Sequence, residues 1–248
     1  MIFVHGFGGD ALGTWMLFPK MLPLDQATAG HDIYFFGYDS LHRQAAYSAA
    51  DLADLLKKIL RHPFEVVESA AVFTAKERDK KFRYDRVTIV AHSLGSVIAR
   101  RALLDLSRDK SVRPYLKDVR LVFFAPAHMG ASVIRLAAAA MGVLRLPVIP
   151  LYLQFTWPVL HDLEEGSQTL EILLNETESA YQNAVAAGEP THHLVAEVVV
   201  HAEEDKVVIQ NPFGRDPPLT RAPKTGHLGI CKPTDGYLDP LKHLMPHL

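Results

Sequence analysis

Cysteine is nearly absent from this sequence. Its one cysteine, Cys231, can form no disulfide within the chain, and a metal site built from several thiolates is excluded. Chains with so few cysteines are typical of a reducing compartment. No basic segment followed by a long apolar stretch begins the sequence, so it shows no sign of a signal peptide. On these grounds we expect a cytoplasmic protein.

An excess of charge of either sign is also missing. The chain has 28 acidic and 26 basic side chains, so no overall field would attract it to nucleic acid or to an anionic membrane. We therefore expect no nucleic-acid partner. The ligand has to be sought in local chemistry.

Long hydrophobic runs are missing too. The most apolar region, 131–160, is interrupted by two arginines and three prolines and falls short of the roughly 20 apolar residues that a membrane-spanning helix needs. We expect no transmembrane helix, whereas contact with a membrane surface is left open. Hydrophobic residues still make up 48% of the 248 residues, enough for one large core. The length fits a single domain with one active site.

Short β-branched or aromatic runs alternate with helical patterns along the chain. Five runs predict buried strands, at residues 2–4, 33–36, 87–90, 121–124 and 197–200. Apolar residues at helical spacing predict a helix at 51–60, and a second helix is expected after Pro63. This alternation is typical of an α/β protein whose mostly parallel sheet carries helices on both faces.

A long insertion, at about 128–190, separates the fourth predicted strand from the fifth. Its first half is apolar and rich in small residues, and Ser167 precedes an amphipathic pattern in the position of a helix N-cap. We interpret the insertion as a helical cap on the single domain. A cap that shelters an acyl chain and ordinary core packing both fit this composition.

Ser93 lies in the most informative segment, RVTIVAHSLGS at 86–96, where a buried strand runs into a helix. Such a turn strains the serine backbone and projects its Oγ above the sheet, and it requires small residues two positions before and after the serine. Ala91 and Gly95 occupy these positions, although glycine is usual at both. Ser93 is therefore predicted as a nucleophile; the alternative is a serine that only caps a helix.

The segment HGFGG at 5–9 follows the first predicted strand, and its glycines allow the backbone to approach a ligand closely. The helix that begins after Ser93 also directs its positive end toward the place where an oxyanion would form. We expect the backbone N–H groups of Phe7 and Leu94 to form an oxyanion hole.

A dinucleotide-binding fingerprint is the competing interpretation of the same glycines. Gly6, Gly8 and Ala11 match its spacing after a strand, and Asp39 follows the second strand. That fingerprint needs an unbroken helix at the glycines, yet prolines stand at 19 and 23, and Asp39 lies beyond the usual spacing of about 20 residues. The hydrolase interpretation is therefore favoured.

A serine hydroxyl attacks only when a histidine, oriented by a carboxylate, accepts its proton. Asp205 stands in a loop just beyond the strand at 197–200, where the acid is expected in the chain order serine, acid, histidine. Glu203 and Glu204 are the rival acids. Of 13 histidines, His227 lies in a glycine-flanked loop near the C-terminus and is the predicted base.

Other histidines suggest no metal centre. His192, His193 and His201 lack the His-Glu-x-x-His or paired-cysteine spacing of known metal sites. We expect neither a metal ion nor a cofactor.

The ordered set of HGFGG at 5–9, AHSLG at 91–95, Asp205 and His227 resembles the α/β-hydrolase superfamily over almost the whole chain. Within it, shorter motifs resemble the lipase-like relatives of the GPI inositol deacylases: TW at 14–15, FGYDS at 36–40, APAHMG at 125–130 and HLGICKP at 227–233. This resemblance implies an α/β-hydrolase fold and hydrolysis of carboxylic esters, including lipid esters. It also makes His5, His92 and His128 candidate substrate-binding residues.

These patterns together predict ester hydrolysis through an acyl-enzyme. Ser93 attacks, His227 carries the proton, and Asp205 orients His227. The expected partner is a small-molecule or lipid ester. Acyl transfer and thioester hydrolysis would use the same residues, and a binding protein that has lost catalysis is the alternative from another class. The sequence does not distinguish these alternatives or give an oligomeric state.

Overall fold

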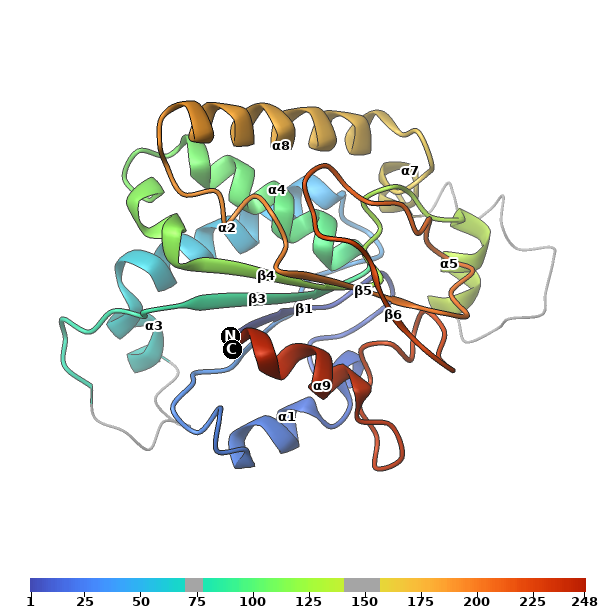
Figure 1. The fold of residues 1–248 in the computed structure, drawn as a ribbon, viewed down its shortest axis with the longest axis horizontal. Helices are drawn as coiled ribbons and strands as arrows, with labels where there is room; N and C mark the ends of the chain where they lie inside the picture. Colours follow the sequence, from blue (N-terminus) through green and yellow to red (C-terminus); the bar gives the residue numbers. More distant parts are fainter. Residues whose placement is uncertain (70–77, 141–156) are drawn as a thin grey trace.

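A computed structural model describes residues 1–69, 78–140 and 157–248 of the chain (Figure 1). Within these ranges the centre of the molecule is an all-parallel, six-stranded β-sheet in the order β2-β1-β3-β4-β5-β6. The strands are β1 (Ile2–Val4), β2 (Tyr34–Phe36), β3 (Val87–His92), β4 (Val119–Phe124), β5 (Val198–Ala202) and β6 (Thr220–Ala222). Every residue of β3 is buried, as expected for a central parallel strand with both faces covered.

All five predicted strands are confirmed, with small shifts at their ends. The sheet also contains β6, which the sequence pattern did not predict. Its three residues, Thr-Arg-Ala, include only one buried side chain, because β6 forms the edge of the sheet and faces solvent. A short edge strand of this kind carries no hydrophobic signal.

Helices cover both faces of the sheet, as predicted. In Figure 1, α2 (Ala45–Arg61), α4 (Leu94–Arg108) and α8 (Gln168–Ala186) lie on one side, whereas α1 (Phe18–Met21) and α9 (Asp239–Leu244) lie on the other. The helix predicted at 51–60 is confirmed within α2, and α3 (Pro63–Ser69) follows it. None of the helices in the described ranges is long and apolar enough to cross a membrane.

The predicted cap is described in part. It contributes α5 (Val133–Ala140), α7 (Val159–Asp162) and α8, while residues 141–156 lie outside the described residues. The predicted N-cap is confirmed, because Ser167 Oγ accepts a hydrogen bond from the backbone N–H of Leu170. The role of the insertion as a cap over the site stays a prediction.

An aromatic cluster anchors the loop that follows β1. The ring of Phe3 lies 4.9 Å from Trp15 in an edge-to-face arrangement and 4.9 Å from Phe35 in a stacked one. Trp15 is fully buried, in the 3-10 helix η1 (Gly13–Trp15). Aromatic pairs of this kind contribute about 0.5–1.5 kcal/mol each beyond their buried area. They hold the loop at 5–9 beside the carboxyl end of β3.

Candidate active site

Ser93 occupies a strained turn between β3 and α4. Its backbone has φ 52° and ψ −121°, a conformation that residues other than glycine rarely adopt. Four hydrogen bonds hold it there. The Ser93 N–H donates to the carbonyl of Phe124 (3.1 Å), and the Ser93 carbonyl accepts from Ser96 Oγ (2.5 Å) and from the backbone N–H groups of Ser96 (3.1 Å) and Ala127 (3.3 Å). The surrounding structure thus maintains the turn geometry predicted from the sequence.

Gly95 allows α4 to start directly against the end of β1. A Cβ atom at this position would lie 2.3 Å from the carbonyl oxygen of Val4 and 2.4 Å from that of His5, closer than real Cβ contacts. Ala91, by contrast, is fully buried in β3 between Val4 of β1 and Phe123 of β4. The fold therefore accommodates the extra methyl group at Ala91, whereas Gly95 admits no side chain.

Ser93, His227 and Asp205 come together from three separate segments. His227 Nε2 lies 3.0 Å from Ser93 Oγ, and His227 Nδ1 lies 2.8 Å from Asp205 Oδ2. The side chains of His227 and Asp205 are 3% and 0% exposed. Because a carboxylate only accepts, Nδ1 carries the proton and Nε2 of the neutral ring is free to accept the Ser93 hydroxyl proton. This is the tautomer that a general base for Ser93 requires.

Asp205 is held in its ionised form. Burial alone would raise its pKa, but hydrogen bonds from His227 and from the backbone amides of Val207 (2.7 Å) and Val208 (3.3 Å) lower the pKa below its usual value. The rival acids Glu203 and Glu204 are exposed and make no hydrogen bond with His227. Only Asp205 of the three thus has the contact that the acid role requires.

The loop at 5–9 lies against Ser93. A Cβ atom built on Gly6 would be 2.9 Å from Ser93 Cβ, so the backbone of this loop passes directly beside Ser93. Phe7 is the second residue of a turn closed by a hydrogen bond from Gly9 N–H to the Gly6 carbonyl (3.1 Å). Leu94 is the first residue of α4, where N–H groups have no acceptor within the helix. The oxyanion hole formed by the Phe7 and Leu94 amides stays a prediction that this placement supports.

All three predicted substrate-binding histidines contact other groups of the protein. The ring of His5 stacks on Tyr38 at 4.2 Å, and its Nδ1 lies 2.9 Å from the Gly6 carbonyl. His92 Nε2 lies 2.9 Å from the carbonyl of His227. Burial lowers the pKa of both, that of His92 to about 3, so the His92 ring is neutral. Substrate contact by these rings stays a prediction.

The third, His128, lies in a buried network with Arg100 and two aromatic rings. Its ring packs against Phe123 and Phe213, and its Nε2 lies 3.4 Å from Arg100 Nε. Arg100 pairs with Asp216 at 2.5 Å, and their side chains are 1% and 2% exposed. A substrate contact for His128 likewise stays a prediction.

Sequence reasoning did not find Arg100 or Asp216. The available signal was the position of Arg100 on α4 between Val97 and Leu104, where a buried apolar residue is expected. A charged residue on the buried face of a helix requires a partner, and Asp216 supplies one from 116 residues away.

The dinucleotide interpretation fails in the structure. The segment after the glycines at 6 and 8 leads into η1, whereas the fingerprint needs an α-helix that begins at the glycines. Asp39 forms a local turn instead, since its Oδ1 accepts hydrogen bonds from the backbone amides of Leu41 and His42.

Several solved structures share the fold of this chain. Phospholipase PlaB from Legionella pneumophila, in complex with thio-NAD, is 19% identical with a TM-score of 0.51; the match covers 82% of this chain and 37% of that chain. The product of gene lin2722 from Listeria innocua is 11% identical with a TM-score of 0.52, covering 99% of this chain and 92% of that one. Identities this low show a shared fold alone. This chain spans little more than a third of the length of the Legionella phospholipase.

Sequence comparison gives the family. No curated protein sequence matches this chain. The sequence model of the alpha/beta hydrolase family, however, matches residues 1–235. This range contains β1 to β6 as well as Ser93, Asp205 and His227. This chain belongs to the alpha/beta hydrolase family.

Proposed function

We propose that this protein is a serine hydrolase that cleaves carboxylic esters through an acyl-enzyme intermediate. The single observation that carries the proposal is the continuous relay from Ser93 Oγ to His227 (3.0 Å) and from His227 to Asp205 (2.8 Å). A buried relay of a hydroxyl, an imidazole and a carboxylate is the arrangement that activates serine as a nucleophile.

The reaction follows from the roles of the three side chains. Ser93 Oγ attacks the ester carbonyl carbon while His227 Nε2 accepts the hydroxyl proton, and Asp205 stabilises the resulting imidazolium. The amides of Phe7 and Leu94 donate to the oxyanion of the tetrahedral intermediate. His227 then returns the proton to the leaving alcohol, which departs as the acyl-enzyme forms. Water, deprotonated by His227, attacks the acyl carbonyl carbon. The bond to Ser93 Oγ then breaks, His227 returns the proton to Oγ, and the carboxylic acid is released.

The narrower sequence resemblance supplies the substrate class. The motifs shared with the lipase-like relatives of the GPI inositol deacylases favour lipid esters. The Legionella structure named as a phospholipase agrees with that direction, although its likeness to this chain establishes only the fold. We therefore include lipid esters among the proposed substrates.

Hydrolysis of p-nitrophenyl esters tests the proposal. The Ser93→Ala variant should lose turnover and labelling by a fluorophosphonate, because both need the Ser93 hydroxyl. Ser107→Ala, which removes a hydroxyl at the far end of α4, is the matched control and should keep both. Turnover retained by Ser93→Ala would overturn the proposal. A wild-type protein that neither reacts nor is labelled would instead favour a binding protein on this fold.

Two further measurements refine the substrate. Rates compared across acyl lengths from acetyl to palmitoyl test the lipid assignment, and a preference for acetyl esters would argue against it. Product analysis with a competing alcohol or thiol acceptor separates hydrolysis from acyl transfer, because both reactions pass through the same acyl-enzyme.

A further inference from the structure

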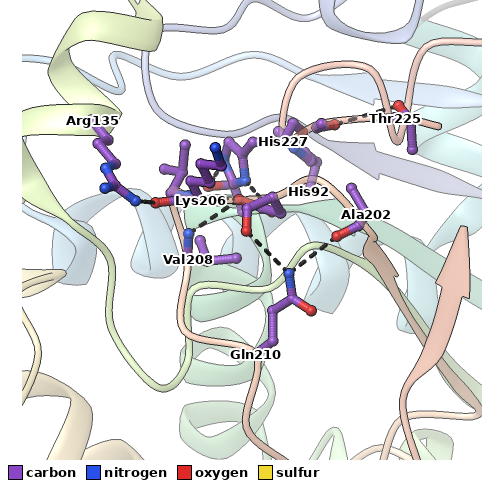
Figure 2. A network of polar contacts seen from close by, with 12 residues as sticks. His92, Arg135, Ala202, Lys206, Val208, Gln210, Thr225 and His227 are labelled. Carbon is purple, nitrogen blue, oxygen red and sulfur yellow. Dashed lines mark hydrogen bonds and ion pairs between the residues drawn. The ribbon is translucent and has the colours of Figure 1, made fainter. Parts of the chain in front are cut away.

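The backbone carbonyl groups of both His227 and Asp205 accept a hydrogen bond from a side chain elsewhere in the chain. His92 Nε2 lies 2.9 Å from the His227 carbonyl oxygen, and Gln210 Nε2 lies 3.2 Å from that of Asp205. Figure 2 shows His92 beside His227, and Gln210 with its amide directed at Ala202. Neither contact involves the atoms of the proton relay itself.

His92 connects the nucleophile strand to the base. It is the last residue of β3 and directly precedes Ser93, while His227 stands 135 positions away in sequence. Because a carbonyl oxygen only accepts, His92 Nε2 must carry the proton of the neutral ring. His92 is 3% exposed, so water competes little for this hydrogen bond. Strand β3, which ends directly before Ser93, therefore also holds the backbone of His227 through His92.

Gln210 closes the turn that carries the acid. Its Nε2 lies 3.1 Å from the carbonyl oxygen of Ala202, the last residue of β5, as well as 3.2 Å from that of Asp205. Only the amide nitrogen of glutamine, which has two N–H groups, can face two carbonyl oxygens, so the orientation of this side chain is determined by chemistry. The amide thus ties Asp205 to the end of β5.

Both contacts hold segments that have little regular structure of their own. His227 has Gly226 before it and Gly229 two residues after it, and glycines leave a loop with many accessible conformations. Asp205 lies in a loop that connects β5 to β6. A hydrogen bond to the backbone of each residue removes freedom that would otherwise disturb the 2.8 Å and 3.0 Å contacts of the relay.

We propose that His92 and Gln210 are positioning residues: His92 holds the backbone of His227, and Gln210 holds the backbone of Asp205, so that the relay to Ser93 stays aligned. The inference rests on the proposed function for its kinetic readout. It gives His92 a role other than the substrate contact predicted from the sequence, and it assigns a role to Gln210, which the sequence did not single out.

Paired variants test the two contacts. His92→Phe and Gln210→Leu each remove the donor and keep a similar volume, whereas His92→Gln restores an N–H group near the position of Nε2. His193→Phe, at another buried histidine, and Gln182→Leu, at an exposed glutamine on α8, are the matched controls. Thermal unfolding of each variant separates a loss of fold from a loss of alignment. Gln210 is only half-buried, so its replacement disturbs the fold less than replacement of buried His92.

We expect kcat for a p-nitrophenyl ester to fall about 10- to 100-fold in His92→Phe and Gln210→Leu, with KM and the unfolding temperature little changed, because misplacement of a catalytic group by about 1 Å has an effect of this size. His92→Gln should recover most of the rate. The double variant should lose less than the product of the two single losses, because both act on one relay.

The NMR signal of the His227 Nδ1 proton reports alignment without turnover. This proton should exchange faster with solvent in His92→Phe and Gln210→Leu than in the wild type and the two controls. An active wild type with unchanged kcat in both variants would overturn the inference, and so would a rise in KM alone, which would assign His92 to substrate contact. If the wild type is inactive, the proposed function fails, and unchanged exchange of the Nδ1 proton would still refute positioning separately.

Discussion

His227 Nδ1 lies 2.8 Å from Asp205 Oδ2, although the two are 22 positions apart in sequence and the strand β6 lies between them. Both partners are buried, so water weakens their interaction little. The contact sets the ring orientation that presents His227 Nε2 to Ser93 Oγ. The parallel order of β5 and β6 at the sheet edge is what brings the two loops together.

Replacement of the acid should remove catalysis and leave the fold intact. In Asp205→Asn the side chain no longer requires a proton on His227 Nδ1, so the tautomer that can accept the Ser93 proton is disfavoured. We expect kcat to fall by about 10⁴ at neutral pH. Glu203→Gln and Glu204→Gln, the two exposed neighbours, should keep wild-type kcat in the same ester assay. A large loss in either of them, with activity kept in Asp205→Asn, would assign the acid elsewhere.

The elbow should tolerate no side chain at Gly95. In Gly95→Ala the new methyl would press on the carbonyl oxygens of Val4 and His5 and push α4 away from β1. We expect about 1–3 kcal/mol of lost stability in urea unfolding. Gly236→Ala is the control, because a Cβ atom there meets no atom within 4 Å. Equal stability of the two variants would contradict the close approach.

Loss of Arg100 should be far more costly than loss of an exposed arginine. Arg100→Met leaves the Asp216 carboxylate buried without its cation, which is expected to cost about 3–5 kcal/mol of folding free energy. Arg113→Met breaks the ion pair with Glu189, which is about two-fifths exposed, and should cost at most about 1 kcal/mol. Chemical unfolding of both variants checks the difference.

The double variant Arg100→Met/Asp216→Leu provides the second arm of that test. It removes the unpaired charge, so it should be more stable than Arg100→Met alone. A double variant that is no more stable would show that the packing of Arg100 between the aromatic rings of Phe123 and Phe213 outweighs its charge.

Acid should destabilise the fold through its buried histidines. Burial, with smaller effects of His192 and Arg113, lowers the pKa of His193 to about 4. Unfolded histidine titrates near pH 6.5, so between these values the unfolded chain binds a proton that the native chain does not. Stability at this site should therefore fall as the pH drops from about 6.5 to 4, by about 1.4 kcal/mol per pH unit.

The His193→Phe variant isolates this contribution. Urea unfolding across the same pH window should show a shallower loss of stability than in the wild type, because the variant removes one of the protons that the unfolded chain takes up. The same pH dependence in both proteins would contradict the low pKa of His193.

Burial explains which parts of the fold were predictable from sequence. Central strands such as β3 are covered on both faces and therefore consist of continuous apolar residues, which identify them without knowledge of their neighbours. β6 escaped prediction because it lies at the edge, where only Ala222 is buried. The helix N-cap at Ser167 was predictable because capping depends on neighbours within one turn.

In the candidate site too, local features were predictable from sequence and long-range contacts were not. Ser93 was predictable because the requirement for small residues at 91 and 95 is local to its turn. The choice of Asp205 over Glu203 and Glu204 depends on which carboxylate reaches His227, and the sequence only favoured it through its position. The contacts of His92 with the His227 carbonyl and of Arg100 with Asp216 join residues more than 100 positions apart. No local pattern records such pairs.

The sequence by itself therefore determined the class of the fold, the elbow at Ser93 and the order of the residues that follow it, because these depend on burial periodicity and on local backbone sterics. The tertiary structure alone decided how the loops after β5 and β6 meet, which carboxylate faces His227, and that His92 contacts the backbone of His227. Those relationships depend on parallel strands that bring distant loops to the same edge of the sheet.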